Sequence, residues 1–385
     1  MPNSPIKSLI HISPGSIPSQ YAHTVQIMKM AEALSLQVRN FELLTSGDLL
    51  SILTRKKAAF QELYGLHKRF PITRIPMHVA KKYSLTDHYC GGTLYYRLSA
   101  LYCMMKSPSL IYARTLAGLE IILKTGLPVL WEHHTTLDER FFQNIRIYPN
   151  LIGIIATTTN LGDIAVGGGF PPDRILVEQN AVDLDNFEPY RTKVEARRMI
   201  DLDSSRPIVT YVGHLYERKG TTTILDIAGL MPSCDFVFVG GWEEDVKILR
   251  EACAARKLEN VRLVGHINQP GLRDYFYAAD ILILPTSDHP DHTIMGSQLK
   301  LFEYMASRRP FVASALPSVK TVVSDGVNAL LAEPGNPSSF RDAIQRLIDD
   351  PGLGERLSRQ AYEDVQYYTW DKRAARILEF AAKKL

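Results

Sequence analysis

The sequence predicts an α/β protein with two doubly wound domains that face each other across a cleft. Three observations indicate this fold. The length of 385 residues suits two domains rather than one. Short β-rich runs alternate with helical patterns along the chain, and the alternation restarts after a polar stretch near the middle. Strands that alternate with helices form parallel sheets with right-handed crossovers, and such sheets bind ligands at the carboxyl ends of their strands.

The first half contains seven short runs that are typical of buried strands. They are Ser8–Ser13, Gln37–Leu44, Pro71–Met77, Leu110–Arg114, Val129–His133, Leu151–Thr157 and Ile175–Gln179. A Pro/Gly/Ser turn over residues 14–18 follows the first run, and apolar residues then recur at helical spacing from Val25 to Leu34. We expect an N-terminal Rossmann-like domain over residues 1–188.

A polar stretch near Asp185–Thr192, which contains Pro189, is predicted to link the domains. Five further strands follow: Ile208–Gly213, Phe236–Gly241, Val261–Gly265, Ile281–Pro285 and Phe311–Ser314. Helices are expected over Glu244–Arg256 and Lys300–Ala306. The predicted C-terminal domain, residues 189–369, is also Rossmann-like. A last helix over residues 370–385 could cross back to the N-terminal domain.

Composition excludes several classes of protein. Lys and Arg total 44 and Asp and Glu total 41, so the net charge of +3 is too small to indicate a nucleic-acid-binding surface. No apolar run is long enough to span a bilayer, and the N-terminus lacks the pattern of a signal peptide. The four cysteines, at 90, 103, 234 and 253, are far apart and contain no CxxC pair, which favours reduced thiols. We therefore expect a cytoplasmic protein.

A phosphate-binding pattern occurs at residues 211–220, YVGHLYERKG. A strand ends at Gly213, a tight loop follows, and Lys219 and Gly220 open the next helix. Backbone N–H groups at such a strand end, together with a lysine, suit a diphosphate. The alternative is a glycine turn beside a solvated Lys219, and the motif alone does not decide between them.

A second pattern, residues 296–306, reads GSQLKLFEYMA. Ser297 can cap the helix, which leaves the first amides of the helix free to meet an anion. Glu303 could accept hydrogen bonds from the two hydroxyls of a ribose. The alternative is a surface ion pair between Lys300 and Glu303 at spacing i,i+3, worth a few tenths of a kcal/mol.

In this order along the chain, the motifs resemble the donor half of glycosyltransferase family 4, the group 1 glycosyltransferases. The shared segments are residues 213–220, VRLVGHI, AADILILP, KLFEYMA and NALLAEPG. The first half also fits, through IYAR, LPVLWEHH and NAVDLDNF. The resemblance covers essentially the whole chain. It implies two Rossmann-like domains in the GT-B arrangement, with the acceptor bound by residues 1–188 and the donor by residues 189–369. It also implies a retaining transfer from a nucleotide-sugar donor.

The resemblance also assigns roles to individual residues. His134 would approach the transferred sugar and Lys219 would bind the donor diphosphate, so these two are the predicted catalytic residues. Glu303 would bind the ribose. The other implied donor-binding residues are Gly15 and Ser16 on the N-terminal side, Asn180, Gly213 and His214, His266 and Ile267 along the base, and Gly296, Ser297, Gln298 and Leu299 around the phosphates and sugar.

Two positions depart from the family pattern. His214 stands where many members have an arginine, and Met295 stands where many have the first of two glutamates. A subgroup with the pattern S-x-x-K-L-F-E-Y, which Ser297–Tyr304 matches, shares the second departure. The resemblance implies that no metal is required, because helix ends and cations neutralise the leaving group. The two histidines of the polar loop 289–292 could suggest a metal site, but such pairs bind nothing in most proteins. The donor is expected to be a nucleotide sugar, with UDP-sugars favoured and GDP-mannose next.

The function predicted from these residues is retaining transfer of a sugar to a hydroxyl of a saccharide or lipid-linked acceptor. The resemblance implies a role in the assembly of a surface polysaccharide or glycolipid, by a front-face mechanism. Lys219 and the amides near Ser297 would stabilise the departing diphosphate. Two alternatives remain: a nucleotide-sugar epimerase of the same fold, and a non-catalytic nucleotide-sugar-binding subunit, to which His214 and Met295 give some weight.

A basic segment over Arg55–Lys82 indicates a further partner. Eight Lys and Arg residues accompany one acid, Glu62, so the segment carries +7 whereas the whole chain carries +3. Apolar residues are interspersed, as in an interfacial amphipathic helix. The segment therefore predicts a peripheral contact with the inner face of a membrane, or with an anionic acceptor. The alternative is an ordinary solvated helix face.

Overall fold

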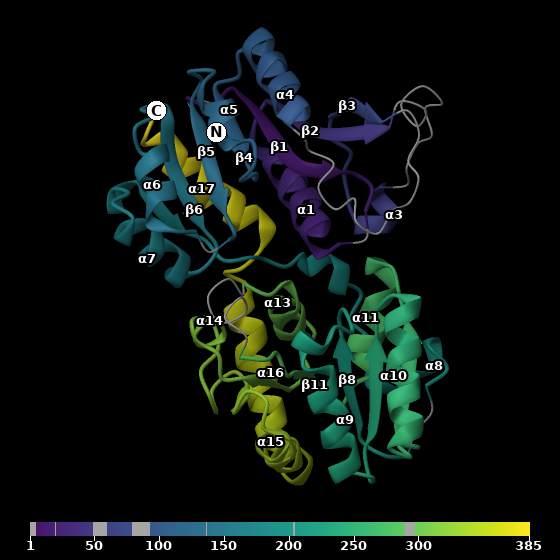
Figure 1. Cartoon of the computed structure of the whole chain (residues 1–385). Helices are drawn as coiled ribbons and strands as arrows, with labels where there is room; N and C mark the ends of the chain where they lie inside the picture. The colour runs from purple at the N-terminus through teal and green to yellow at the C-terminus, as the bar shows by residue number, and fades with distance from the viewer. Residues whose placement is uncertain are drawn as a thin grey trace. The chain divides into compact units, whose positions relative to one another are not determined.

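The computed structural model describes residues 5–19, 21–48, 60–78, 93–135, 137–202, 205–288 and 297–385. The chain divides into two compact units (Figure 1), the first formed by residues 1–180 with 370–385 and the second by residues 181–369. The chain enters the second unit after Asn180, earlier than the boundary predicted between residues 188 and 189. It returns at Trp370, so the C-terminal helix is part of the first unit.

A parallel sheet forms the centre of the first unit, in the order β3-β2-β1-β4-β5-β6-β7. Its strands are β1 (Ser8–Ser16), β2 (Asn40–Asp48), β3 (Ile72–His78), β4 (Leu110–Ala113), β5 (Val129–His133), β6 (Leu151–Ala156) and β7 (Ile175–Val177). Strands β4, β5 and β6 are buried along their whole length, as strands between two layers of helices must be. The strand order reverses between β1 and β4, which is where sheets of this type bind ligands.

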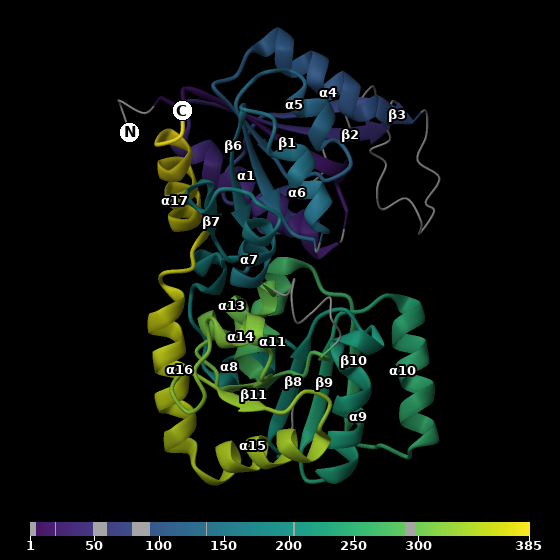
Figure 2. The same cartoon turned by 60° about the vertical axis from the view of Figure 1, so that its left-hand side comes forward.

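Helices flank this sheet (Figures 1 and 2). They are α1 (Ala22–Gln37), α3 (Phe60–Tyr64), α4 (Thr93–Lys106), α5 (Leu119–Leu123), α6 (Glu139–Ile145), α7 (Thr159–Gly167) and α17 (Trp370–Ala382), with a 3₁₀ turn η1 (Pro172–Arg174) before β7. Helix α4 packs against α5, and α17 packs against α1. The C-terminal helix is therefore an integral layer of the first unit.

The second unit repeats this plan, with the parallel order β10-β9-β8-β11-β12-β13. Its strands are β8 (Ile208–Val212), β9 (Asp235–Val239), β10 (Val261–Gly265), β11 (Ile281–Leu284), β12 (Phe311–Ser314) and β13 (Leu330–Ala332). Tyr211 and Val212, which are neighbours in β8, pack into different apolar cores on the two sides of the sheet. The strand order reverses between β8 and β11.

The helices of the second unit cover both cores. They are α8 (Lys193–Met199), α9 (Thr221–Leu230), α10 (Glu243–Ala255), α11 (Gln269–Ala278), α13 (Leu299–Ala306), α14 (Pro317–Lys320), α15 (Pro337–Asp349) and α16 (Pro351–Val365), with 3₁₀ turns η2 (Leu184–Phe187) and η3 (Glu217–Lys219). Helices α11 and α13 contribute to one core, and α9 and α15 to the other. In the described ranges, no helix has both the length and the apolarity needed to cross a bilayer.

Both sheets are parallel and flanked by helices, which confirms the predicted fold class. Several details differ from the prediction. Strand β1 continues to Ser16 through the predicted turn, with a shift of register after Ile12. The short strand β13, inside the segment NALLAEPG, was not predicted. In the predicted linker, Phe187 is 6% exposed and packs into a core of the second unit.

Candidate functional site

The loop that follows β8 brings Lys219 to the carboxyl edge of the second sheet, at the point where the strand order reverses. Gly220 adopts a left-handed conformation with φ of 80°. A Cβ at this position would lie 1.8 Å from the carbonyl oxygen of Pro285, so only glycine allows the loop to approach the end of β11 so closely. The hydroxyl of Ser287 donates a hydrogen bond to the carbonyl of Arg218 at 2.9 Å, which joins the two strand ends.

The ammonium group of Lys219 is poorly solvated at this position. Burial, followed by the positive charge of Arg218, lowers the pKa of Lys219 to about 8. An ammonium that has lost part of its water and has a cationic neighbour gains free energy when an anion binds beside it. This loop can therefore bind a phosphate or a similar anion.

Helix α13 is held against the same strand ends by Tyr304. The hydroxyl of this buried side chain accepts a hydrogen bond from the amide of Val212 at 3.0 Å and donates one to the carbonyl of Ile283 at 3.2 Å. The N-cap of α13 is Gln298, not the predicted Ser297, and no side chain caps this end of the helix. The Gln298 side chain instead lies 3.0 Å from the hydroxyl of Thr286, beyond the end of β11.

Lys300 and Glu303 form the ion pair that the sequence offered as the alternative to ribose binding. Their Nζ and Oε2 atoms lie 2.7 Å apart, and the side chains are 23% and 13% exposed. The pair is therefore more buried than the solvated surface pair considered from the sequence. It leaves a carboxylate and an ammonium side by side on the first two turns of α13.

Aromatic rings line the ends of β8, β9 and β10. His214 stacks on Tyr216, with ring centroids 5.1 Å apart, and lies 5.9 Å from Trp242. His266 stacks on Trp242 at 6.3 Å, and the Trp242 indole donates a hydrogen bond to the Tyr216 hydroxyl at 3.1 Å. Tyr216 and Trp242 were not among the predicted site residues. Four aromatic rings at consecutive strand ends form a surface on which a planar base or a sugar ring can pack.

His214 differs in charge from the arginine that many family members have there. Burial lowers its pKa to about 4, and the charges of Lys219 and Lys300 contribute to this effect. The ring is therefore neutral near pH 7. The positive charge near it comes from Lys219 and Lys300.

In the first unit, His134 follows β5 and belongs to a buried polar network. Its Nε2 lies 2.5 Å from Oε1 of Glu132 and 3.0 Å from Nε of Arg114. The Glu132 carboxylate is fully buried and also meets Nη1 of Arg373, from α17, at 3.3 Å. Burial alone would raise the pKa of Glu132, but Arg373 and His134 more than offset this and lower it to about 2. Burial and Arg114 lower the pKa of His134 to about 4.

The other predicted residues fall into two groups, one in each unit. Gly15 lies in β1, where its carbonyl accepts a hydrogen bond from the Thr45 hydroxyl at 2.5 Å, and Asn180 is buried where the first unit ends. Ile267 packs partly into a core of the second unit. The Ser16 side chain, Gly296 and the loop 289–292 lie outside the described residues.

Glu132 and Arg373 are the polar residues that the sequence analysis missed. The sequence contained one sign of this network, since Glu132 is an acid within the predicted strand VLWEH. A charge in a buried strand needs a partner. The partner could not be found from the pattern, since Arg373 is 241 residues further along the chain.

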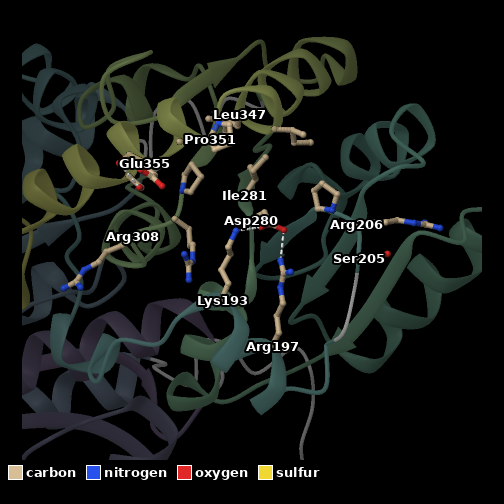
Figure 3. Close-up of a pocket in the computed structure, with 16 residues that line it drawn as sticks. Lys193, Arg197, Ser205, Arg206, Asp280, Ile281, Arg308, Leu347, Pro351 and Glu355 are labelled. Atoms are coloured by element: carbon tan, nitrogen blue, oxygen red, sulfur yellow. Dashed lines mark hydrogen bonds and ion pairs between the residues drawn. The ribbon is translucent and has the colours of Figure 1, made fainter.

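A pocket in the second unit lies at the amino ends of β8, β11 and β12, at the edge opposite Lys219. Its volume is about 460 Å³, and basic side chains line it. Figure 3 shows Lys193 and Arg197 reaching the same carboxylate, that of Asp280, and both do so at 2.6 Å. Asp280 also accepts a hydrogen bond from the amide of Ile208 at 2.8 Å. These contacts fix α8 to the sheet, and we assign the pocket no role in donor binding.

Two units that each contain a parallel sheet flanked by helices are typical of the GT-B fold. Residues 206–350 match the family described as Glycosyl transferases group 1. This part of the chain is therefore similar to the family that its motifs predicted.

Known proteins similar to this chain agree with this assignment. A D-inositol 3-phosphate glycosyltransferase of Xylanimonas cellulosilytica is 26% identical over 244 residues, which are 60% of this chain and 56% of that protein. The chain thus spans little more than half the length of this curated relative. Two solved structures share the fold. Sucrose-phosphate synthase from Thermosynechococcus elongatus has a TM-score of 0.77 and 18% identity, and the match covers 96% of this chain and 97% of that chain. Anabaena HepE in complex with UDP-glucose has a TM-score of 0.71 and 16% identity, and the match covers 97% of this chain and 99% of that chain.

Proposed function

We propose that this chain is a retaining glycosyltransferase that moves a sugar from a nucleotide-diphosphate donor to a hydroxyl acceptor. The observation that carries the proposal is the desolvated ammonium of Lys219 at the reversal point of the second sheet. A diphosphate leaving group carries negative charge that grows as the bond to the sugar breaks. A cation that is already poorly solvated stabilises that charge more than a fully hydrated one would.

The rest of the donor would bind around Lys219. We assign the base to the ring surface that includes His266 and Trp242, and the ribose hydroxyls to the Glu303 carboxylate. The first amides of α13, beyond Gln298, would donate to the phosphates. The complexes of Anabaena HepE with UDP and with UDP-glucose support UDP-sugars as the first donors to test, with GDP-mannose next.

His134 would contact the donor sugar without acting as a strong base, because its pKa of about 4 makes it neutral and weakly basic near pH 7. The acceptor proton would pass toward the leaving phosphate on the front face of the sugar, which retains the anomeric configuration. The acceptor would be a saccharide or a lipid-linked sugar in the assembly of a surface polysaccharide or glycolipid.

The test is incubation of the purified chain with a panel of UDP-, GDP- and ADP-sugars, with and without hydroxyl acceptors. Release of the nucleotide diphosphate and the anomeric configuration of the product by NMR are measured. We expect one donor class to be consumed and the configuration to be retained. An inverted product would contradict the mechanism. Donor binding without turnover for every acceptor would instead indicate a non-catalytic subunit.

We also propose a peripheral membrane contact, through the segment Arg55–Lys82 together with helix α4; residues 55–59 and 79–82 of that segment lie outside the described residues. In the described part of that segment, residues 60–78, Tyr64 and Leu66 are buried, and the only helix there is the five-residue α3. In contrast, α4 exposes an apolar stripe at helical spacing: Leu94, Leu98, Leu101 and Met105, beside Met104, are 37–70% exposed.

Charge complementarity favours an anionic bilayer as the partner of this stripe. Arg97 and Lys106 are exposed on α4, and Lys68 and Arg69 are exposed in the segment that precedes β3. Strand β3 packs against α4. A helix with an exposed apolar stripe and basic neighbours lies in the headgroup region, where each basic residue contributes about 1 kcal/mol.

A further inference from the structure

The pocket at the amino ends of β8, β11 and β12 contains more positive than negative charge. Among the described residues that line it, five are Lys or Arg and two are acids. Figure 3 shows Lys193 and Arg197 directed toward Asp280. Arg206 and Arg308 point away from Asp280 in the same view. The charge balance inside the pocket therefore depends on the groups around Asp280.

Three cations act on the single carboxylate of Asp280. Lys193 and Arg197, both on α8, each meet it at 2.6 Å. The third cation is Arg309, which precedes β12. Burial lowers the pKa of Arg309, and the charge of Asp280 acts in the opposite direction, so the two groups interact. Since an arginine keeps its charge in proteins, the groups around Asp280 carry an excess of two positive charges.

The guanidinium of Arg309 also has an unused donor. Its Nε donates a hydrogen bond to the carbonyl of Tyr277 at 3.1 Å. Its Nη2 is buried and has no hydrogen-bond partner within the part of the chain that the structure describes. A buried donor without a partner is costly, and a cation that has lost part of its water gains free energy when an anion binds beside it.

The excess charge lies in a concave site that water reaches only in part. The side chains of Arg197 and Asp280 are 20% and 22% exposed, so their charges are screened less than those at an open surface. A cleft lined by charge of one sign attracts ions of the opposite sign. A phosphate monoester carries a charge of about −1.5 to −2 at neutral pH, which matches the excess.

The pocket is larger than a phosphate group. Its volume of about 460 Å³ lies in the range of roughly 300–1,000 Å³ that is typical of sites for small organic molecules. Part of its wall is apolar and consists of Pro207, Ile281, Pro310, Leu347 and Ile348. An organic group attached to the phosphate therefore has a surface on which to pack.

We propose that this pocket is a second ligand site, which binds a small phosphate monoester and is separate from the donor site. The phosphate binds among Lys193, Arg197 and Arg309, and the organic group packs against the apolar wall. Strand β8, which has five residues, separates this site from the loop of Lys219 by about 15 Å. The inference goes beyond the proposed function and depends on neither the donor nor transfer.

The main experiment is calorimetry on the full chain, with glucose 6-phosphate and glycerol 3-phosphate as probes. Inorganic phosphate and glucose are the comparisons. Each titration is done with the unaltered protein in saturating UDP and with the Lys219→Ala variant, so that the donor site does not contribute. We expect a phosphate monoester to bind at one site, inorganic phosphate to bind more weakly, and glucose not to bind. If neither monoester binds, or if inorganic phosphate binds as tightly as both, the inference is wrong.

Two substitutions change the charge of the pocket in opposite directions. Arg309→Gln removes one cation and keeps an N–H donor, so affinity for the monoester should fall on the order of tenfold. Asp280→Asn removes the carboxylate that competes with the phosphate, so the folded variant should bind the monoester more tightly than the unaltered protein. Unchanged affinity in Arg309→Gln, or weaker binding in folded Asp280→Asn, would contradict the charge balance on which the site rests.

Arg206→Gln is the matched control. It removes the same charge from the edge of the pocket, but Arg206 points away from Asp280 and its side chain is 51% exposed. Affinity for the monoester should therefore change by less than about twofold. A loss as large as that in Arg309→Gln would indicate general attraction to a basic surface and would overturn the inference. Because the Lys219→Ala titrations require neither UDP nor turnover, their result stands apart from the outcome of the donor screen.

Discussion

At the scale of single residues, Lys219 has the most direct test. Lys219→Ala should lower kcat/KM for transfer on the order of 10²–10³-fold, because a charge-assisted contact to the leaving diphosphate is lost. The thermal unfolding temperature should hardly change, since a poorly solvated ammonium with a cationic neighbour does not stabilise the fold. Lys320→Ala, at an exposed lysine on α14, is the control. Near-normal kcat/KM in Lys219→Ala would remove this residue from the site.

The pKa of Lys219 adds a pH dependence to that prediction. Because this pKa is about 8, the free protein loses the ammonium proton as pH rises through that value. Affinity for UDP, measured by calorimetry, should therefore fall between about pH 7 and about pH 9. His214 does not contribute, since its pKa is about 4 and it is already neutral. The Lys219→Ala variant should bind weakly and without this pH dependence.

Glu303→Gln should weaken the binding of UDP and GDP alike, by about 1.5–3 kcal/mol, because both nucleotides contain the ribose assigned to this carboxylate. Sugar selectivity should change less. Lys300→Met is the informative control, since it breaks the 2.7 Å ion pair and leaves the carboxylate in place. If the two variants bind UDP and GDP equally well, Glu303 has only the structural role of an ion-pair partner.

Residues whose role depends on local sequence could be predicted, whereas residues that act through distant partners could not. Lys219 and Gly220 were found because a strand, a glycine turn and a lysine are neighbours along the chain. Glu132 and Arg373 meet only after β5 and α17 have packed into one unit. The stacking of Trp242 on His266 likewise depends on the alignment of β9 and β10, which composition does not specify.

At the scale of elements, the attachment of α8 to the second sheet depends on one carboxylate, that of Asp280. Burial would raise its pKa, but Lys193, the Ile208 amide and Arg197 outweigh this and lower it. A lowered folded-state pKa means that the stabilisation is present above the ordinary value of 3.8 and is lost as pH falls through the folded value. Asp280→Asn should therefore cost about 1–3 kcal/mol of unfolding free energy at neutral pH, and less in acid.

The control for Asp280 is Asp226→Asn. The ion pair of Asp226 with Arg256 has side chains 47% and 37% exposed, so its loss should change the unfolding free energy by at most about 1 kcal/mol. Denaturant unfolding at several pH values measures both. Equal effects of the two substitutions would contradict the structural role assigned to Asp280.

Helix α4 is the element proposed to contact the membrane. Replacing Leu98 and Leu101 by Glu should strongly reduce co-sedimentation with anionic vesicles at low salt, because it puts charge into the apolar stripe. Ile248→Glu, at a 56% exposed position on α10, should have no such effect. Binding of the unaltered protein should weaken with added salt and with neutral lipid. Absence of binding at low salt would refute the membrane contact and favour a soluble acceptor.

The elements themselves were predicted where apolar runs are long and bounded by turn residues. Strands β5 and β10 were placed at their observed ends, because VLWEH and VRLVG are compact β-rich runs. Strand β13 was not predicted, because a run of three residues is too short to show a periodic pattern of apolar residues. Ser297 was the better cap by residue type, but α13 begins one residue later, where the contacts of Tyr304 with β8 and β11 place the helix.

At the scale of the whole molecule, the chain completes its first unit only with its last helix. Arg373 and Arg376 of α17 pair with Glu132 and Glu178, which lie about 200 residues or more earlier in the sequence. Removing α17 would leave Glu132 as a buried charge without its cation, and breaking one such pair costs about 3–5 kcal/mol. The second unit, residues 181–369, would keep every contact described around Lys219 and α13.

A chain that ends at Thr369 should therefore unfold in two steps. The first unit should unfold at a much lower temperature than in the full chain, whereas the second unit should keep its affinity for UDP and be stabilised by it. Transfer should be lost, because Glu132, which contacts His134, no longer has Arg373 as its partner. A chain that ends at Ala382 is the control: it keeps both arginines and loses only Lys383, Lys384 and Leu385. The ion-pair partners of the two lysines, Glu379 and Asp173, are 61% and 74% exposed, so these pairs contribute little. Calorimetric scans with and without UDP measure both steps. If the shorter chain loses UDP binding while the control keeps it, the donor site depends on the first unit, and the assignment of nucleotide binding to the second unit alone is wrong.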